Sequence, residues 1–163
     1  MGVTIGQKLR VTNYKLLVKT AAIISMFCML AGCGFIYYHN PEKARETANT
    51  FLSFLYTEKD IDKAYDMTNK FYKDNFGRQD LEKTSSYFLT KFGKFEGTRA
   101  KDYFTEGGSK ELIVFYVAVS EGGITYQKVI LNDEGKEGYK VSGLVISDKP
   151  FTGYRLIKHY KEL

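Results

Sequence analysis

The sequence predicts an α+β fold, with N-terminal helices packed on a curved antiparallel sheet of about four strands, preceded by a hydrophobic N-terminal anchor or signal. Two observations predict this class. Apolar residues recur at helical spacing between residues 41 and 92, and after Gly93 the apolar pattern changes to one typical of strands. The length of 163 residues and the ordinary composition fit one globular domain, over 41–163, behind a leader, 1–40.

The leader contains an uncharged run of 19 residues, 20–38, preceded by four basic residues. If the leader is a secretory signal, residues 1–19 are its basic region and residues 21–30 its apolar core. Leu30-Ala31-Gly32-Cys33 then matches the lipobox of bacterial lipoproteins. In such proteins the thiol of Cys33 takes a diacylglyceryl group and becomes the new N-terminus, and the acyl chains hold a soluble domain on a membrane.

The same run also fits an uncleaved transmembrane helix. Its 19 residues span roughly 28 Å, close to the thickness of the apolar core of a bilayer. Tyr37 and Tyr38 would lie in the far interfacial belt, and a cleaved, secreted form is a third alternative. Positive charge precedes the run in every case, so we expect residues 41–163 outside the cytoplasm, at the cell envelope.

Charge and cysteine use narrow the function classes. The leader carries four basic residues and no acid, so residues 41–163 hold 20 basic and 19 acidic residues. A near-neutral domain lacks the basic surface of a duplex-binding protein, and we expect no nucleic-acid partner. Cys28 and Cys33 both lie in the leader, which leaves the domain without a disulfide or a thiolate metal site.

Three helices are expected first. Pro41 at the first turn and apolar residues at helical spacing predict a helix over 41–57. Asp60 is a suitable cap for a second helix that continues to about Tyr72. After a break at 75–77, a third helix is expected to end at Gly93.

Strands follow the helices. Residues 94–105, 124–131 and 139–147 predict three of them, and 154–161 predicts a last short strand or helix. The segment 111–120 is apolar on both faces, which predicts a central strand that is covered twice. We expect one face of it to pack on the first helix, around Phe51 and Leu55, and the other to line a cone-shaped pocket. The first set is Leu112, Val114, Tyr116 and Ala118, and the second is Ile113, Phe115, Val117 and Val119.

Three stretches carry a family resemblance. They are Ala44…Phe51-Leu52…Leu55, Asp60-Ile61-Asp62-Lys63-Ala64-Tyr65 and Tyr139-Lys140-Val141-Ser142-Gly143-Leu144. Over roughly residues 45–147 the chain resembles the small exported, cystatin-like or nuclear-transport-factor-2-like α+β roll domains, many of them membrane-tethered and of unknown function. The resemblance implies that any catalytic Asp, His or Tyr would lie inside the cone between sheet and helices.

Few residues are candidates for a site. Asp102, Tyr103, Tyr116 and Tyr126 lie on predicted strands and are the candidate pocket-lining residues. The two histidines, at positions 39 and 159, are too far apart in the sequence to predict a metal site. The Gly-x-Ser-x-Gly motif, the phosphate-binding loop and the His-Glu-x-x-His motif do not occur. We therefore expect no catalysis, no cofactor and no metal.

The sequence favours a membrane-tethered, extracytoplasmic binding domain, whose partner is another envelope protein or a small apolar ligand. One alternative is a structural subunit of an envelope secretion or conjugation assembly, for which lipidation of Cys33 would be contrary evidence. Another is a small isomerase-like or dehydratase-like enzyme, which would need a buried acid in the pocket. The 10 Phe and 10 Tyr of residues 41–163 predict either a well-filled core or the lining of a cavity or contact face.

Overall fold

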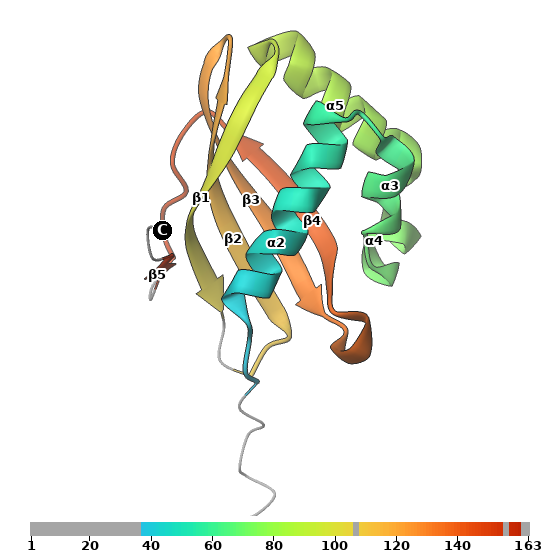
Figure 1. Cartoon of the computed structure of the whole chain (residues 1–163), viewed down its shortest axis with the longest axis vertical. Coiled ribbons are helices and arrows are strands. Elements are labelled where there is room, and N and C mark those ends of the chain that lie inside the picture. Colours follow the sequence, from blue (N-terminus) through green and yellow to red (C-terminus); the bar gives the residue numbers. More distant parts are fainter. Residues whose placement is uncertain (1–36, 106–107, 155–156, 161–163) are drawn as a thin grey trace, which may run out of the picture. The chain divides into compact units, whose positions relative to one another are not determined.

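The structure, a computed structural model, describes residues 37–105, 108–154 and 157–160. Within this part the fold is α+β, with the helices on one side of a five-stranded antiparallel sheet (Figure 1). The predicted class is therefore confirmed, with one strand more than the four expected. The predicted leader lies outside the described residues up to position 36, and Cys33 lies there too. No helix in the described part of the chain is long and apolar enough to cross a membrane.

The strands follow one another across the sheet in the order β4-β3-β2-β1-β5. They are β1 (Phe95–Thr105), β2 (Glu111–Ser120), β3 (Gly123–Asp133), β4 (Tyr139–Ser147) and β5 (Lys158–His159). The first four agree with the predicted strands to within two residues at either end. β5 pairs with β1 through His159 opposite Asp102, so the last predicted element is a strand.

The first helix begins and ends within the predicted range 41–57. It consists of α2 (Pro41–Leu52) and a π-helical turn, η1 (Ser53–Thr57). Asn40 caps α2, because its side-chain oxygen accepts a hydrogen bond from the amide of Lys43 at 3.1 Å. The helix is thus confirmed in extent, and only the winding of its last turn differs.

Helix α3 (Ile61–Asp66) begins where Asp60 predicts a helix start. The carboxylate of Asp60 accepts a hydrogen bond from the amide of Lys63 at 3.1 Å and forms an ion pair with the ammonium group at 2.9 Å. These bonds from Lys63 lower the pKa of Asp60, because they stabilise its charged form. The predicted cap is confirmed.

The expectation that this helix continues to Tyr72 is wrong. Asn69 leaves the helix and donates its amide hydrogen to the carbonyl of Val141 on β4, at 2.8 Å. Its side chain then caps a separate helix, α4 (Lys70–Asn75), by accepting a hydrogen bond from the amide of Tyr72. A pairing between distant segments interrupts the helix here, and helical spacing gives no sign of it.

Helix α5 (Arg78–Phe92) ends at Gly93, as predicted. Gly93 has φ of 76°, a left-handed conformation that favours glycine. The end of α5 also lies against the turn between β2 and β3, where the amide of Gly122 donates to the carbonyl of Phe92 at 2.7 Å. A Cβ on Gly122 would lie 2.8 Å from that oxygen, so only glycine fits this close approach.

The core lies between the helices and the facing side of the sheet. Phe51 and Leu55 belong to one buried cluster with Leu112 and Val114 of β2, which confirms the predicted packing of the first helix. An aromatic group within this cluster joins η1, α5 and β1, since the ring centre of Tyr56 lies 4.5 Å from that of Phe88 and 5.2 Å from that of Phe95.

Candidate binding surface

Two of the predicted pocket-lining residues, Tyr116 and Tyr103, face the helices. The hydroxyl of Tyr116 donates to the side-chain oxygen of Asn49 on α2 at 2.8 Å, and burial raises its pKa. Tyr103 lies opposite Val114, and its ring centre is 4.9 Å from that of Tyr160. Both side chains are therefore engaged by the surrounding fold.

The other two, Asp102 and Tyr126, lie on the opposite face of the sheet. Residues directly opposite in an antiparallel pair share a face. Asp102 lies opposite Phe115, and Tyr126 lies opposite Val117, whereas Tyr116 lies opposite Gln127. The four candidates are thus divided two and two, and the structure does not bring them together around one pocket.

Both histidines have partners. One ring nitrogen of His39 donates to the carbonyl of Ser109 at 2.9 Å, and the other lies 3.2 Å from the hydroxyl of Tyr139. His159, which is largely exposed, pairs with the carboxylate of Asp102. Among the described residues, no group of three His, Cys, Asp or Glu side chains is placed to hold a metal ion.

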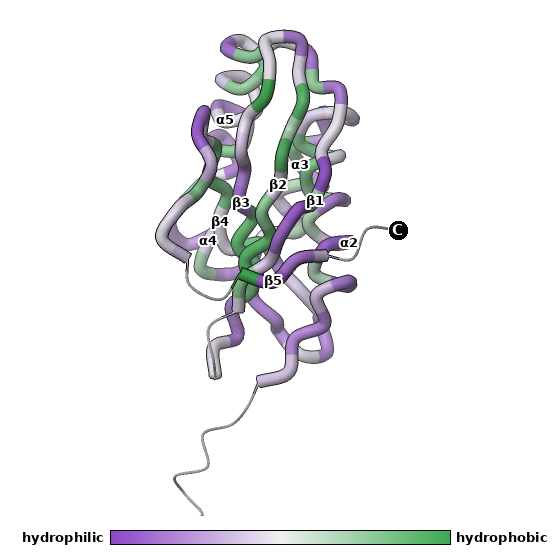
Figure 2. Tube along the Cα trace, turned by 90° about the vertical axis from the view of Figure 1, so that its left-hand side faces the viewer, coloured by the Kyte–Doolittle hydropathy of each residue, from purple (hydrophilic) through white to green (hydrophobic). Residues whose placement is uncertain are grey.

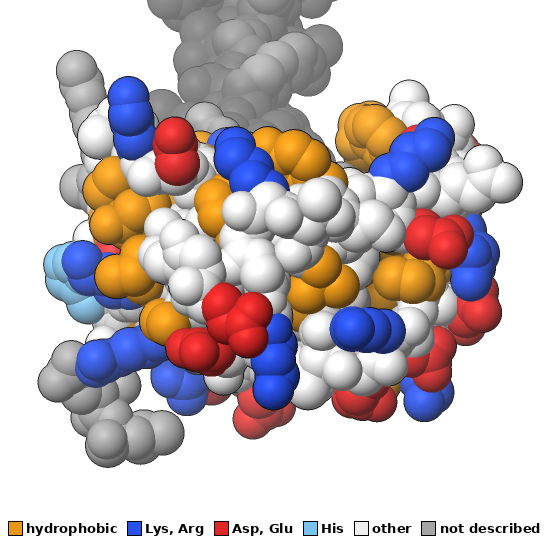
Figure 3. Space-filling view, turned by 90° about the horizontal axis from the view of Figure 1, so that it is seen from above, with side chains coloured by type: hydrophobic (Ala, Val, Ile, Leu, Met, Phe, Trp, Pro, Cys, Tyr) orange, Lys and Arg blue, Asp and Glu red, His pale blue; other side chains and the backbone are white. Residues whose placement is uncertain are grey.

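The sheet face opposite the helices carries five neighbouring apolar side chains near the turn between β2 and β3. We call this group the hairpin patch; it consists of Val117, Val119, Ile124, Tyr126 and Val145. Ile124 is 58% exposed, Val119 is 42% exposed and Val145 is 39% exposed. Figure 2 views the sheet from this side. Figure 3, seen from above, shows hydrophobic side chains at the surface between charged ones.

The strand register makes the hairpin patch continuous. Val119 lies directly opposite Ile124, and Val117 lies directly opposite Tyr126, so two apolar pairs stand side by side across β2 and β3. Val145 of β4 is the diagonal neighbour of Tyr126, because Tyr126 lies opposite Ser147. An open sheet face usually has polar residues at such positions. The patch therefore breaks the expected alternation.

The chain itself covers another part of this face, around Phe115. The ring centre of Phe115 lies 5.9 Å from that of Phe151 and 4.9 Å from that of Tyr154. The ammonium group of Lys128 donates to the hydroxyl of Tyr154 at 2.8 Å. The segment after β4 thus crosses the sheet over Phe115 and leaves the hairpin patch bare.

A groove of about 1030 Å³ adjoins the hairpin patch, at the edge of β1 that faces α2. Val117 and Val119 belong both to the groove and to the patch. Within the described part of the chain, β5 pairs only with Asp102 and Tyr103, so the groove runs along a stretch of β1 that has a partner strand on one side only. Charges of both signs line it, from Arg45, Glu46, Glu96, Arg99 and Lys101.

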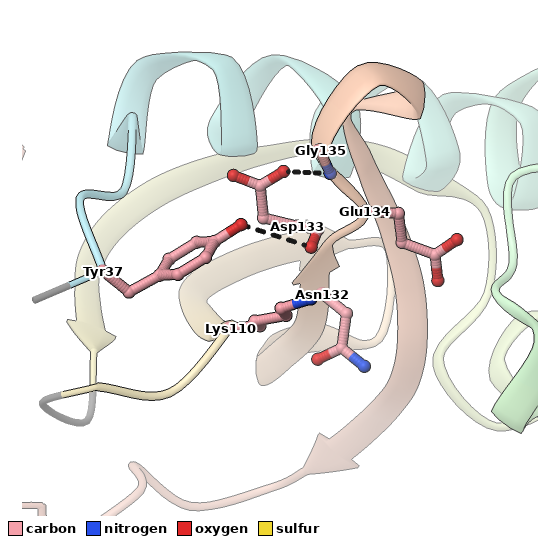
Figure 4. A pocket seen from close by; sticks show the side chains of 6 residues that line it. All are labelled: Tyr37, Lys110, Asn132, Asp133, Glu134 and Gly135. Atoms are coloured by element: carbon pink, nitrogen blue, oxygen red, sulfur yellow. Dashed lines mark hydrogen bonds between the residues drawn. The ribbon is translucent and has the colours of Figure 1, made fainter. Parts of the chain in front are cut away.

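A second hollow, of about 460 Å³, lies beside the loop after β3 (Figure 4). The carboxylate of Asp133 accepts a hydrogen bond from the amide of Gly135 at 2.9 Å, and the carbonyl of Asp133 lies 3.5 Å from the hydroxyl of Tyr37. Through these contacts Asp133 and Tyr37 stabilise the loop after β3. We assign no ligand to this hollow.

Tyr56 gives the structure a testable sensitivity to alkali. Its hydroxyl is buried without a hydrogen-bond partner among the described residues, and burial raises its pKa above the ordinary value of 10.0. Below pH 10 the phenol is neutral in the folded and unfolded states alike. Above pH 10 only the unfolded state ionises readily, so the free energy of unfolding falls by about 1.4 kcal/mol per pH unit for this one side chain.

Tyr56→Phe should therefore keep the stability of the natural chain at pH 7 and lose less of it between pH 10 and pH 11. Urea unfolding of the full chain in detergent at these pH values measures the difference. Tyr87→Phe, at an exposed position of α5, is the matched control and should follow the natural chain. Equal losses in Tyr56→Phe and in the natural chain would contradict the burial of this phenol.

Sequence reasoning missed the hairpin patch, although a signal was present. Val119 and Ile124 flank the two-residue turn Glu121-Gly122 at equal distance along the two strands. Two apolar residues paired across a short turn and pointing away from the core predict a contact surface at that turn.

Comparison with known proteins identifies no relative of the chain. No family model matches it, and no curated protein or solved structure is significantly similar to it. A function for this chain must therefore be argued from its own residues.

Proposed function

We propose that residues 41–163 form a non-catalytic, extracytoplasmic domain, tethered to the membrane of a bacterial envelope, that binds another envelope protein through the hairpin patch. The observation that carries the proposal is the exposed pair Val119 and Ile124, on a sheet face where Phe151 and Tyr154 cover Phe115 but not this pair. The apolar run in the leader supports the tether.

The position of the hairpin patch favours a protein over a small apolar ligand. Small ligands bind in concave sites that enclose most of their surface. The patch instead lies on an exposed sheet face, and its five side chains come from three adjacent strands. A contiguous apolar area of this kind, bordered by polar residues, is typical of a contact with another protein. We therefore expect the hairpin patch to bind an apolar surface of the partner protein.

The groove beside β1 gives this contact a polar border. Val117 and Val119 are shared by groove and patch, and five of the other residues that line the groove carry charges of either sign. Polar rims around an apolar centre set the orientation and specificity of a protein contact more than its strength.

The fold supports the same proposal. Helices packed on one face of a curved antiparallel sheet suit the cystatin-like roll domains that the sequence resembles, and we propose that the domain is such a roll. In this arrangement Asp102 is paired with His159 on the face away from the helices, which does not favour an acid-dependent enzyme in the cone.

Photo-crosslinking in the native cells tests the proposal. A crosslinking amino acid at Ile124 of the full chain should give a discrete product with one partner, recovered in the membrane fraction. The same amino acid at Phe71, an exposed apolar position on α4 that is 60% exposed, should not give that product.

Val119→Asp should reduce the product from Ile124 at least tenfold, because a carboxylate in the contact must be desolvated. Its melting temperature should stay near that of the natural chain, since Val119 is exposed. Identical products from Ile124 and Phe71, or a product unchanged by Val119→Asp, would contradict the patch as the binding surface. A product found only in the soluble fraction would contradict the tether.

A further inference from the structure

Two polar side chains of β3, Thr125 and Gln127, lie inside the core. Both are completely buried and face the helices, because Gln127 lies opposite Tyr116. Among the described residues, neither the hydroxyl of Thr125 nor the amide nitrogen and oxygen of Gln127 has a hydrogen-bond partner. Buried polar groups in native proteins almost always have one, in the protein or in bound water.

The neighbouring side chains do not supply the missing bonds. The hydroxyl of Tyr116, opposite Gln127 on β2, is already donated to Asn49. On β4, Gln127 faces the apolar Ile146. Thr125 lies opposite Ala118, where the row of large helix-facing side chains on β2 ends.

The chemistry of the two side chains defines the guest they would accept. The amide nitrogen of Gln127 donates, its oxygen accepts, and the hydroxyl of Thr125 does either, so the guest must donate and accept. It must also be neutral, because among the described residues no charged side chain is buried in the core to offer an opposite charge. The Cα atoms of Thr125 and Gln127, two residues apart on one face of β3, are about 7 Å apart, and the long side chain of Gln127 can bring its amide group nearer to the hydroxyl of Thr125 than this. A single water bridges polar atoms up to about 6 Å apart.

We propose that Thr125 and Gln127 form an internal site that binds a water molecule between them, as a permanent part of the core. The site is independent of the proposed binding function, since it lies on the opposite face of the sheet from the hairpin patch.

A double-mutant cycle tests the shared water. Gln127→Met and Thr125→Val keep the size of each side chain, and each should lower the urea midpoint of the full chain in detergent, because the water loses one partner. The double variant should fall by clearly less than the sum of the two shifts, since both changes disturb the same water. Gln79→Met, at an exposed position of α5, is the control and should leave the midpoint unchanged.

The opposite result has an equally definite form. If the two side chains are dry, removing an unpaired polar group should raise the midpoint in each single variant, and the two shifts should add. That outcome overturns the proposal.

Nuclear magnetic resonance gives a second measurement on the natural chain, which does not depend on the variants folding. The side-chain amide protons of Gln127, assigned by their loss in Gln127→Met, should show cross-relaxation with a long-lived signal at the water frequency. If these amide protons show no cross-relaxation with water, or show it only with another molecule, the assignment of water is overturned.

Discussion

Phe88→Ala is expected to destabilise the domain by about 3–5 kcal/mol, a substantial part of the stability of a domain of this size. Phe88 is completely buried, and its ring centre lies 4.5 Å from that of Tyr56 and 5.3 Å from that of Phe92. Truncation removes apolar area from the core and leaves a cavity that the surrounding rings, held by three different elements, can fill only in part.

The neighbouring residue on α5 supplies the control. Tyr87 is exposed, and its hydroxyl accepts a hydrogen bond from the ammonium group of Lys91 at the surface. Tyr87→Ala should cost less than about 0.5 kcal/mol. Urea unfolding of the full chain in detergent compares the two variants. Similar losses for Phe88→Ala and Tyr87→Ala would show that α5 does not pack on the core through this face.

Truncations along β2 should give the second largest effects, graded by face and by position. Leu112→Ala, on the helix-facing side, should cost about 2–5 kcal/mol. On the other face, Phe115→Ala should cost about 3–5 kcal/mol, because Phe151 and Tyr154 cover this ring. Val119→Ala should cost less than about 0.5 kcal/mol, because the side chain is exposed.

This gradient differs from the simple alternation expected if the second face of 112–119 lined a pocket, in which case every residue of that face would be less costly to truncate than those of the first. Denaturant unfolding of the three variants measures it. A loss at Val119 as large as that at Leu112 would mean that the hairpin patch is covered in the isolated protein, and would count against its proposed role in binding.

Local patterns predicted most elements of this fold, because local chemistry determines them. Asp60 caps α3, Gly93 ends α5 in a left-handed conformation, and the β-branched and aromatic run of 111–120 becomes the middle strand. The break at Asn69 escaped prediction because its cause is a hydrogen bond to Val141, far along the chain. Local spacing carries no information on such a pairing.

The candidate site was predicted less well, for a reason of register. Tyr116 and Tyr126 lie on neighbouring strands, but a difference of one residue in pairing moves a side chain to the other face. The two-residue turn pairs Ser120 with Gly123, and counting outward from it places Tyr116 opposite Gln127. The sequence alone contained this count. The cover that Phe151 and Tyr154 provide for Phe115 depends on the path of the C-terminal segment, which no local pattern reveals.

The strand order has a consequence for how the domain reaches its native state. In β4-β3-β2-β1 every spatial neighbour is also a neighbour along the chain, so each pairing closes a short loop and loses little chain entropy. The four strands can therefore zip together hairpin by hairpin, starting at the two-residue turn before Gly123. The contacts of higher sequence separation include those between the helical layer and the sheet, such as Asn49 with Tyr116 and Asn69 with Val141, and those between β1 and β5. We expect these to form last and to open first in hydrogen exchange, which would make the helical layer and the C-terminal strand the parts of the domain that detach while the sheet persists.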